Sequence, residues 1–382
     1  MKKILTIIGA RPQIIKAAAI SRAINTHFTT ELSELILHTG QHYDDNMSSV
    51  FFDELNIPKP AYNLNVGSDT HSKQTASMLV GIEEVLVKER PNALLIYGDT
   101  NSTLAGALAA SKMNVPIIHI EAGLRSFNKT MPEEINRIVA DHLSTLLFTP
   151  TNSGMENLRK EGFQIDATPP FNSDNPKVYL SGDIMLDNSL HFSTIAENKN
   201  EFFIKNEIHQ TNFALCTIHR NANTDDPNKL TDIFEALIEI SESRKIQILL
   251  PLHPRTLKKL DSDIDEIVKR KIKSSVYLKV IPPASFLEMI LLEKNCRLVL
   301  TDSGGLQKEA YYFGKPCVIL RPETEWIELV ESGAAIISDY HKNKIIESSE
   351  KFLNSFTAPT TSYYGDGHAS EFICQKIIQH IA

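Results

Sequence analysis

The chain has 382 residues, 42% of them hydrophobic and 23% charged, a composition typical of a globular protein. This length favours two α/β domains over one core. The formal net charge of −8 argues against a nucleic-acid-binding protein, and no apolar run approaches the roughly 18 residues of a membrane helix.

Short apolar runs alternate with longer runs of helical period, such as 13–24 and 103–112. This alternation predicts parallel sheets joined by right-handed crossover helices. A first series of predicted strands comprises 3–8, 34–38, 93–97, 116–120, 145–148 and 177–180. A second series comprises 213–217, 247–250, 276–280, 297–300, 316–320 and 334–337.

Two strand series predict an α/β protein of two doubly wound, Rossmann-like domains. The polar stretch 166–176 reads as a loop within the first half, and the charged, amide-rich stretch 196–210 marks the junction. We therefore expect an amino-terminal domain over 1–195 and a carboxy-terminal domain over 196–367.

Polar residues follow the predicted strands in both halves. In the first half they occupy 9–11, 39–42, 98–100 and 121–123, and in the second half 219–220, 253–255, 302–305 and 321–323. Open parallel sheets bind ligands at the carboxyl ends of their strands. Two such polar rims facing each other would enclose a cleft.

Ser303, Gly304 and Gly305 lie between a predicted strand and the helical run 306–313. Glycines allow a close backbone approach, and a helix N-terminus attracts anions, so this segment predicts a phosphate seat. Glu309, about one turn further on, could accept hydrogen bonds from ribose hydroxyls. The alternative is an ordinary N-cap and tight turn.

Several cations lie close to predicted strand ends. Arg11 and Lys16 lie near a helix start, where acids are usual, which indicates an anionic ligand; a solvated helix face is the alternative, above all for Lys16. His219-Arg220 and His253-Pro254-Arg255 suit phosphate binding, although a lone histidine is more often structural.

Four acids are candidates for proton transfer. Asp99 and Glu121 end successive apolar strands, so both should reach the cleft, whereas Glu133 and Glu134 open a predicted helix at 132–142. A half-buried carboxylate beside a polyanion suits acid–base chemistry. The alternatives are a turn or N-cap role for Asp99 and charge complementarity at the helix start for one of the two glutamates.

The four cysteines are scattered and show no zinc spacing, so we predict no metal and expect reduced thiols in a cytoplasmic protein.

Long, ordered motifs over nearly the whole chain resemble the non-hydrolysing UDP-N-acetylglucosamine 2-epimerases. They include IIGARPQIIK at 7–16, HTGQHYDDNM at 38–47, YGDTNSTLAGALAASK at 97–112, HIEAGLRSFNKTMPEEINR at 119–137 and LTDSGGLQKEAYYFGKPCVILRPETEW at 300–326. The resemblance implies the GT-B arrangement of two domains across a cleft, with a final helix at 368–382 packed on the first domain. It also implies a UDP-sugar substrate, a homodimer, and no cofactor or nucleic-acid partner.

The resemblance implies that UDP is eliminated to give a 2-acetamidoglucal and then re-added to invert C2. By resemblance, Asp99, Glu121 and Glu133 carry the proton transfers, and His219 and Arg11 stabilise the departing UDP. Ser303, Gly304 and Gly305 would seat the phosphates and Glu309 the ribose. Lys16, Arg137 and His253 are further substrate-binding candidates.

Two departures from the better-known members of this family are consistent with a second possible substrate. Trp326 follows Glu325 where those members carry arginine, and Tyr43-Asp44-Asp45 replaces a segment with arginine that is linked to allosteric activation. Such variants are similar to a branch acting on UDP-2,3-diacetamido-2,3-dideoxy-glucuronate. A glycosyltransferase of the same architecture and a hydrolysing epimerase are further alternatives.

Overall fold

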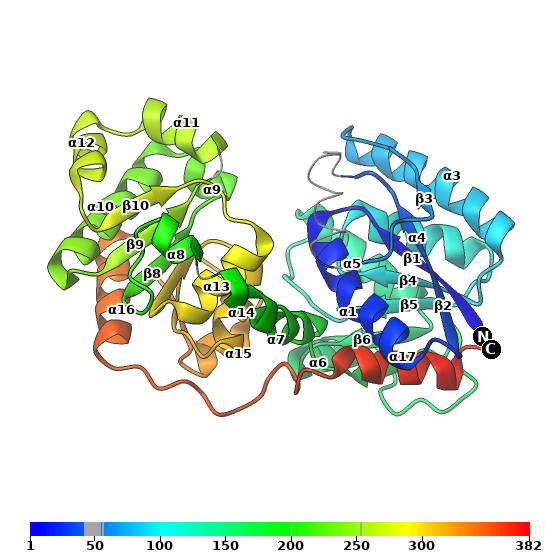
Figure 1. Cartoon of the computed structure of the whole chain (residues 1–382). Coiled ribbons are helices and arrows are strands. Elements are labelled where there is room, and N and C mark those ends of the chain that lie inside the picture. Colours follow the sequence, from blue (N-terminus) through cyan, green and yellow to red (C-terminus); the bar gives the residue numbers. More distant parts are fainter. Residues whose placement is uncertain (42–54, 56, 200, 253) are drawn as a thin grey trace. The chain divides into compact units, whose positions relative to one another are not determined.

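A computed structural model describes residues 1–41, 55, 57–199, 201–252 and 254–382, which form two compact units. Unit 1 comprises Met1–Asn188 and Ser362–Ala382, and unit 2 comprises Ser189–Thr361. In each unit a twisted parallel sheet lies between layers of helices (Figure 1). The expected fold class of two Rossmann-like α/β domains is confirmed.

Among the described residues, the sheet of unit 1 has the order β3-β2-β1-β4-β5-β6-β7. Its strands are β1 (Lys2–Ile8), β2 (Leu32–His38), β3 (Tyr62–Asn63), β4 (Ala93–Tyr97), β5 (Ile117–Ile120), β6 (Leu146–Thr149) and β7 (Lys177–Leu180). Its helices are α1 (Arg11–His27), α3 (His71–Glu89), α4 (Asn101–Lys112), α5 (Pro132–Leu143), α6 (Asn152–Lys160) and α17 (Ala369–His380).

Alternate residues of the buried strands in unit 1 pack on opposite faces of the sheet. Leu5 and Ile7 of β1, for example, join one core cluster with residues of α3 and α4. On the other face α1 packs beside α17, so the end of the chain returns to unit 1. The Lys2 ammonium holds α17 against unit 1 by donating a hydrogen bond of 2.6 Å to the Ile378 carbonyl.

Unit 2 has the strand order β10-β9-β8-β11-β12-β13. Its strands are β8 (Phe213–Thr217), β9 (Gln247–Pro251), β10 (Leu278–Ile281), β11 (Leu298–Thr301), β12 (Cys317–Ile319) and β13 (Ala335–Ile337). Its helices are η1 (Glu197–Lys199), α8 (Glu201–Lys205), α9 (Asn221–Thr224), α10 (Pro227–Arg244), α11 (Pro254–Asp263), α12 (Glu266–Ser274), α13 (Phe286–Asn295), α14 (Gly304–Tyr312), α15 (Ile327–Glu331) and α16 (Lys342–Asn354).

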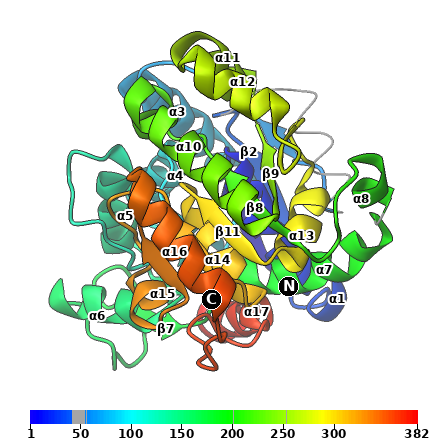
Figure 2. The same cartoon turned by 90° about the vertical axis from the view of Figure 1, so that its left-hand side faces the viewer.

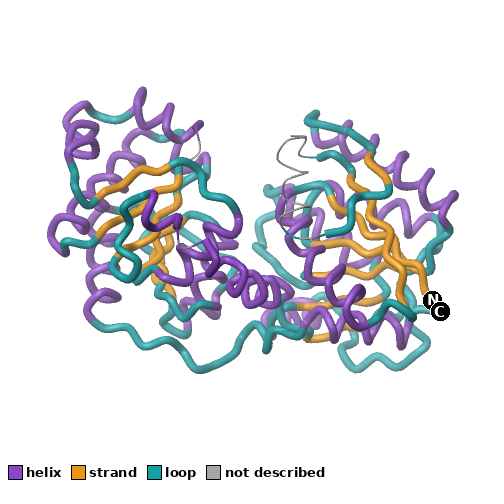
Figure 3. The backbone as a smooth tube through the Cα atoms, viewed as in Figure 1, coloured by secondary structure: helices purple, strands orange, loops and turns teal. Residues whose placement is uncertain are grey.

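The core of unit 2 repeats the layering of unit 1. Apolar residues of α10, α12 and α16 pack on one face of the sheet, with α10 and α16 side by side (Figure 2). Alternate residues of β8, Ala214 and Cys216, belong to that cluster. The tube view shows helices around the strands of each unit (Figure 3).

The predicted boundary at 195/196 differs from the observed division at 188/189. Helix α7 (Ile184–Ala196) continues through the division, so no break in secondary structure marks it. Asn188, the last residue of unit 1 before the division, donates a side-chain hydrogen bond of 2.6 Å to the Ile15 carbonyl of α1. The stretch 196–210, predicted as the junction, carries η1 and α8 within unit 2.

In both units the strand order reverses direction beside the first strand of the unit, between β1 and β4 and between β8 and β11. Doubly wound sheets bind ligands at such switch points, outside the carboxyl ends of the strands. None of the described helices is both long enough and apolar enough to cross a membrane.

Candidate functional site

The switch point of unit 1 is built around a buried glutamine on α1. The Gln13 side-chain oxygen accepts hydrogen bonds from the N–H groups of Gly9 and Ala10, at 2.9 and 3.2 Å. Its amide nitrogen donates to the Tyr97 carbonyl at the end of β4. Gln13 therefore fixes the ends of β1 and β4 relative to each other.

Glycine is required at the end of β1 because the turn is crowded. A Cβ at Gly9 would lie 2.1 Å from the hydroxyl oxygens of both Thr39 and Ser102. The close approach lets the chain turn directly into α1, whose first turn carries Arg11 on the exposed surface.

The two acids predicted at strand ends are each paired with a predicted cation. Glu121 forms an ion pair with Lys16, and both side chains are about nine-tenths buried. Asp99 forms an ion pair with Arg137 of α5, whose side chain is 8% exposed. The structure thus brings together two acids from adjacent strands and two of the predicted substrate-binding cations.

Glu121 lies in a backbone conformation that is unusual for a residue with a side chain. Its φ is +68°, in the left-handed region, where a non-glycine residue costs on the order of 1–3 kcal/mol. Such strain persists only where the surroundings enforce it, and it clusters at functional sites. The conformation turns the chain sharply after β5 and supports a functional assignment for Glu121.

The two glutamates at the start of α5 have different surroundings. Glu134 is 1% exposed and accepts hydrogen bonds from the N–H groups of Ser126 and Phe127, both at 2.9 Å. It also pairs with Arg137 at 3.0 Å. Glu133 is exposed and, among the described residues, forms no hydrogen bond or ion pair. Glu134 therefore has the structural role, which leaves Glu133 accessible to a ligand.

The switch point of unit 2 is organised by Asp302, which is 0% exposed. Its carboxylate accepts hydrogen bonds from the backbone N–H groups of His219 and Arg220, at 3.0–3.1 Å. The Asn223 amide donates a further bond, at 3.2 Å. One buried carboxylate therefore fixes the turn after β8 to the end of β11.

Asp302 also orients the imidazole of His219. Nδ1 of His219 lies 2.9 Å from Oδ1 of Asp302, whereas 54% of the His219 side chain is exposed. Burial would raise the pKa of Asp302, but the contacts with His219 and the backbone N–H bonds outweigh burial, and the pKa is lowered. His219 is therefore held by a carboxylate behind it and presents the rest of its ring to solvent or a ligand.

Helix α14 begins at the predicted phosphate seat. Ser303 is its N-cap and accepts a long hydrogen bond from the Leu306 N–H, at 3.5 Å, so the N-cap alternative also describes the geometry. A Cβ at Gly305 would meet only the Ser303 hydroxyl, at 3.9 Å. Since the protein itself leaves room for a side chain there, the glycine leaves space for a ligand at the helix N-terminus.

Glu309 is partly exposed on α14 and has a buried acidic neighbour on α13. Glu293 is 2% exposed, and its pKa is raised well above the usual value by burial, to which the negative charge of Glu309 adds. No local pattern in the sequence indicates this pair, because the two glutamates are on different helices. His253 and the Tyr43-Asp44-Asp45 segment lie outside the described residues.

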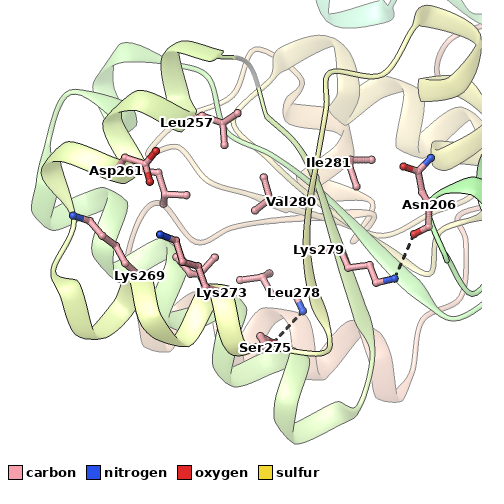
Figure 4. A pocket seen from close by; sticks show the side chains of 12 residues that line it. Asn206, Leu257, Asp261, Lys269, Lys273, Ser275, Leu278, Lys279, Val280 and Ile281 are labelled. Carbon is pink, nitrogen blue, oxygen red and sulfur yellow. Dashed lines mark hydrogen bonds between the residues drawn. The ribbon is translucent and has the colours of Figure 1, made fainter.

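Residues of α11, α12 and β10 line a cavity of about 450 Å³ at the edge of the sheet in unit 2 (Figure 4). Half of its lining residues are aliphatic and three are lysines, and no predicted site residue belongs to it. The described residues include no cluster of three or more histidine, cysteine, aspartate or glutamate side chains placed to hold a metal.

Comparison with known proteins decides the family. The UDP-N-acetylglucosamine 2-epimerase family model matches residues 24–378. The chain belongs to the UDP-N-acetylglucosamine 2-epimerase family. The family predicted from the motifs, and with it the isomerase class of enzyme, is confirmed.

Individual epimerases resemble this family member over almost their whole length. The UDP-2,3-diacetamido-2,3-dideoxy-D-glucuronate 2-epimerase of Pseudomonas aeruginosa is 48% identical and covers 98% of this chain, which covers 99% of that protein. The UDP-N-acetylglucosamine 2-epimerase of Methanocaldococcus jannaschii is 42% identical, with 97% of each chain covered. A crystal structure of the latter organism's UDP-GlcNAc 2-epimerase with UDP-GlcNAc and UDP has a TM-score of 0.84, with 41% identity and 99% of each chain covered.

Sequence reasoning missed a buried group of this epimerase-family chain directly behind Asp99 and Glu121. His119 and Asp141 are both 0% exposed, with Nδ1 of the histidine 2.7 Å from the carboxylate. The signal was present, because His119 interrupts the apolar run 116–120. Its partner could not be found, since Asp141 lies on another element.

Proposed function

We propose that this chain is a non-hydrolysing UDP-N-acetylglucosamine 2-epimerase that interconverts UDP-GlcNAc and UDP-ManNAc. The observation that carries the proposal is the pairing of Asp99 with Arg137 and Glu121 with Lys16. These pairs place two carboxylates at adjacent strand ends, where doubly wound sheets bind ligands. Family membership supports the same reaction.

The chemistry requires a base and an acid because C2 carries an unactivated C–H bond. A base removes the C2 proton while the C1–O bond breaks, UDP leaves with the bonding electrons, and a C1=C2 double bond forms. In the reverse step UDP adds to C1, and an acid delivers a proton to the opposite face of C2. The number of atoms and the oxidation state are conserved, so no redox cofactor is needed.

We assign the proton transfers to Asp99, Glu121 and Glu133. The ion pairs of the first two fix their carboxylates, and positioned acid–base groups typically contribute 10²–10⁴-fold to rate. Glu133 is assigned because it is the exposed member of the pair that opens α5.

We assign UDP binding chiefly to residues of unit 2. Ser303, Gly304 and Gly305 begin α14, whose N-terminal N–H groups and dipole favour phosphate. Glu309 is assigned to the ribose. His219 and Arg11 are assigned to the charge that develops on departing UDP, because cationic donors stabilise such charge.

A second substrate has specific support. The relative from Pseudomonas aeruginosa, whose name specifies UDP-2,3-diacetamido-2,3-dideoxy-D-glucuronate, is 48% identical over 375 residues. The same elimination at C2 would serve that sugar. Both sugars are therefore tested in parallel.

Deuterium incorporation at C2 in heavy water tests the proposal. We expect exchange and formation of the C2 epimer with one or both UDP-sugars, without net loss of UDP-sugar to UDP and free sugar. Asp99→Asn and Glu121→Gln should lower exchange by about 10²–10⁴-fold and leave UDP binding unchanged. Asp174→Asn, at an exposed acid of unit 1, is the matched control.

Three outcomes would contradict the proposal. Absence of exchange with both sugars would exclude 2-epimerisation of either. Accumulation of UDP and free sugar would identify a hydrolysing epimerase, and UDP release that depends on an added acceptor would identify a glycosyltransferase.

We also propose that the enzyme works in the cytoplasm as a homodimer. All four cysteines are buried free thiols, as expected for a reducing compartment. Light scattering of the purified protein tests the dimer.

A further inference from the structure

His119 is enclosed by hydrogen-bond acceptors on both sides of its ring. It is the third residue of β5, and its side chain is 0% exposed. Nδ1 lies 2.7 Å from Oδ1 of Asp141, and Nε2 lies 2.8 Å from the carbonyl oxygen of Gly98. Both distances are those of hydrogen bonds.

The proton count of the ring follows from these two partners. A backbone carbonyl has no proton to give, so Nε2 must donate to Gly98. An ionised carboxylate likewise only accepts, so Nδ1 must donate to Asp141. A neutral imidazole carries one N–H and can satisfy only one partner; an imidazolium satisfies both.

Asp141 is ionised because of its other contacts. Its Oδ2 accepts a bond of 2.7 Å from the Arg125 guanidinium and one of 3.1 Å from the Gly123 N–H. Burial would raise the pKa of Asp141, but His119 and then Arg125 outweigh burial, and the pKa is lowered. Independently of His119, the Arg125 guanidinium and the Gly123 N–H both donate to Asp141, which favours the ionised carboxylate over a protonated acid that donates to His119.

A cationic His119 balances the buried charges of the group. Arg125 also forms a pair of bonds with Glu161 at the end of α6, both at 2.7 Å. The two acids, Asp141 and Glu161, then face the two buried cations, Arg125 and His119. The half-exposed His142 lies at the outer side of the group, 3.4 Å from Glu161. The Lys16–Glu121 ion pair lies near Gly98, and its own charges cancel.

His38 shows the opposite state in the same unit. It is 3% exposed, and its Nδ1 accepts a hydrogen bond of 3.0 Å from the Gly40 N–H, so that nitrogen carries no proton. Burial lowers the pKa of His38. A side-chain hydrogen bond with Asn63 acts in the opposite direction but does not cancel this shift. Burial alone therefore does not create an imidazolium; two facing acceptors do.

The group holds the two turns that carry the proposed catalytic acids. His119 binds the carbonyl of Gly98, directly before Asp99. Asp141 binds the N–H of Gly123, two residues after Glu121. We infer that His119 is an imidazolium which, together with Asp141, positions the turns of Asp99 and Glu121. The positioning role rests on the proposed function, whereas the charge state of His119 does not.

Nitrogen NMR of the wild-type protein labelled with ¹⁵N-histidine tests the charge state. At about pH 8.5, two units above the ordinary histidine pKa of about 6.5, solvated rings are neutral. We expect one ring with a proton on each nitrogen, in slow exchange with solvent. A spectrum in which every ring carries a single N–H at that pH would overturn the inference. The wild-type experiment does not depend on the folding of any variant.

Variants test the positioning role. His119→Gln keeps at most one of the two bonds, so we expect kcat to fall by about 10²-fold, as for small misplacements of reacting groups. The KM and UDP affinity should stay unchanged, because unit 2 is assigned to UDP. His27→Gln changes a half-exposed histidine at the end of α1, outside this group, and serves as the matched control. The doubly protonated NMR signal should disappear from His119→Gln alone.

The outcomes separate this inference from the proposed function. If wild-type protein does not exchange C2 deuterium but shows the imidazolium, the proposed function fails and the charge state stands. If wild-type protein is active and His119→Gln retains full kcat, the positioning role fails. Equal losses of kcat and UDP affinity would indicate general damage to the fold and would also overturn the positioning role.

Discussion

Each unit places a histidine against a buried aspartate, and the two pairs differ in what surrounds the second ring nitrogen. Nδ1–Oδ1 distances are similar, 2.7 Å for His119–Asp141 and 2.9 Å for His219–Asp302. His119 is 0% exposed and bonds the Gly98 carbonyl, whereas the His219 side chain is 54% exposed. In unit 1 the histidine–aspartate pair is buried and connects two turns. In unit 2 the aspartate orients a histidine whose ring remains accessible to a ligand.

This difference predicts that substitution of the aspartate destabilises unit 1 more than unit 2. Asp141→Asn leaves His119 and Arg125 without their shared buried anion, so it should destabilise unit 1 by about 3–5 kcal/mol. Hydrogen exchange followed by mass spectrometry reads each unit separately. We expect faster exchange in peptides of unit 1 only.

Asp302→Asn provides the comparison for that measurement. Its histidine is solvated, and an amide oxygen can still accept the backbone N–H bonds, so unit 2 should lose less stability. Equal destabilisation of the two units would show that exposure of the histidine does not distinguish the pairs.

The largest effect on catalysis from the unit 2 pair should come from the histidine itself. His219→Ala removes a donor assigned to departing UDP, and loss of one such donor typically costs about 10²–10³-fold in kcat. The thermal midpoint should fall modestly, because the Asp302 carboxylate loses its pair with His219 but keeps its bonds from the backbone N–H groups and Asn223. Steady-state kinetics and a melting curve check both, with His209→Ala as the exposed control in unit 2.

Acid should weaken both pairs. The pKa values of Asp141 and Asp302 are lowered in the folded chain, so their contribution to stability is present above the unfolded-state value of about 3.9. It is lost as the pH falls through the folded values. Urea midpoints measured from neutral pH downwards should decline, and Asp141→Asn should flatten the decline for unit 1. A decline unchanged by that substitution would contradict the assignment.

The smallest expected signal is the reaction of thiols in the native protein. Cys216, Cys296 and Cys317 lie in unit 2 and Cys374 in unit 1, all buried. Burial raises the pKa of Cys296 to about 12, so almost no thiolate forms at neutral pH. An aromatic disulfide reagent should react only after unfolding. Early reaction at the three thiols of unit 2 would show that this unit opens first.

Much of the fold followed from periodicity in the sequence. The runs 93–97 and 213–217 coincide with β4 and β8, because buried parallel strands are continuous apolar runs. The run 177–180 coincides with β7, although β7 is a partly exposed edge strand. The two-residue β3 was missed, since it is too short to show a pattern. The division within α7 was also missed, because a continuous helix gives no local signal of a change of unit.

The candidate site was less predictable because its framework depends on distant partners. Asp99, Glu121 and His219 were found as polar residues at strand ends. The roles of Gln13, Asp141 and Asp302 depend on contacts with residues on other elements, and no local pattern encodes them. Glu133 and Glu134 shared one sequence signal, and only the burial of Glu134 separated their roles.

The discontinuity of unit 1 has a consequence for synthesis. Ser362–Ala382 supplies α17, the helix beside α1, and it leaves the ribosome after all of unit 2. Although domains generally fold in the order of translation, here the amino-terminal unit must wait for the last segment to close its surface. Until then the face of α1 that α17 covers stays open to solvent, so we expect unit 2 to reach its final packing before unit 1.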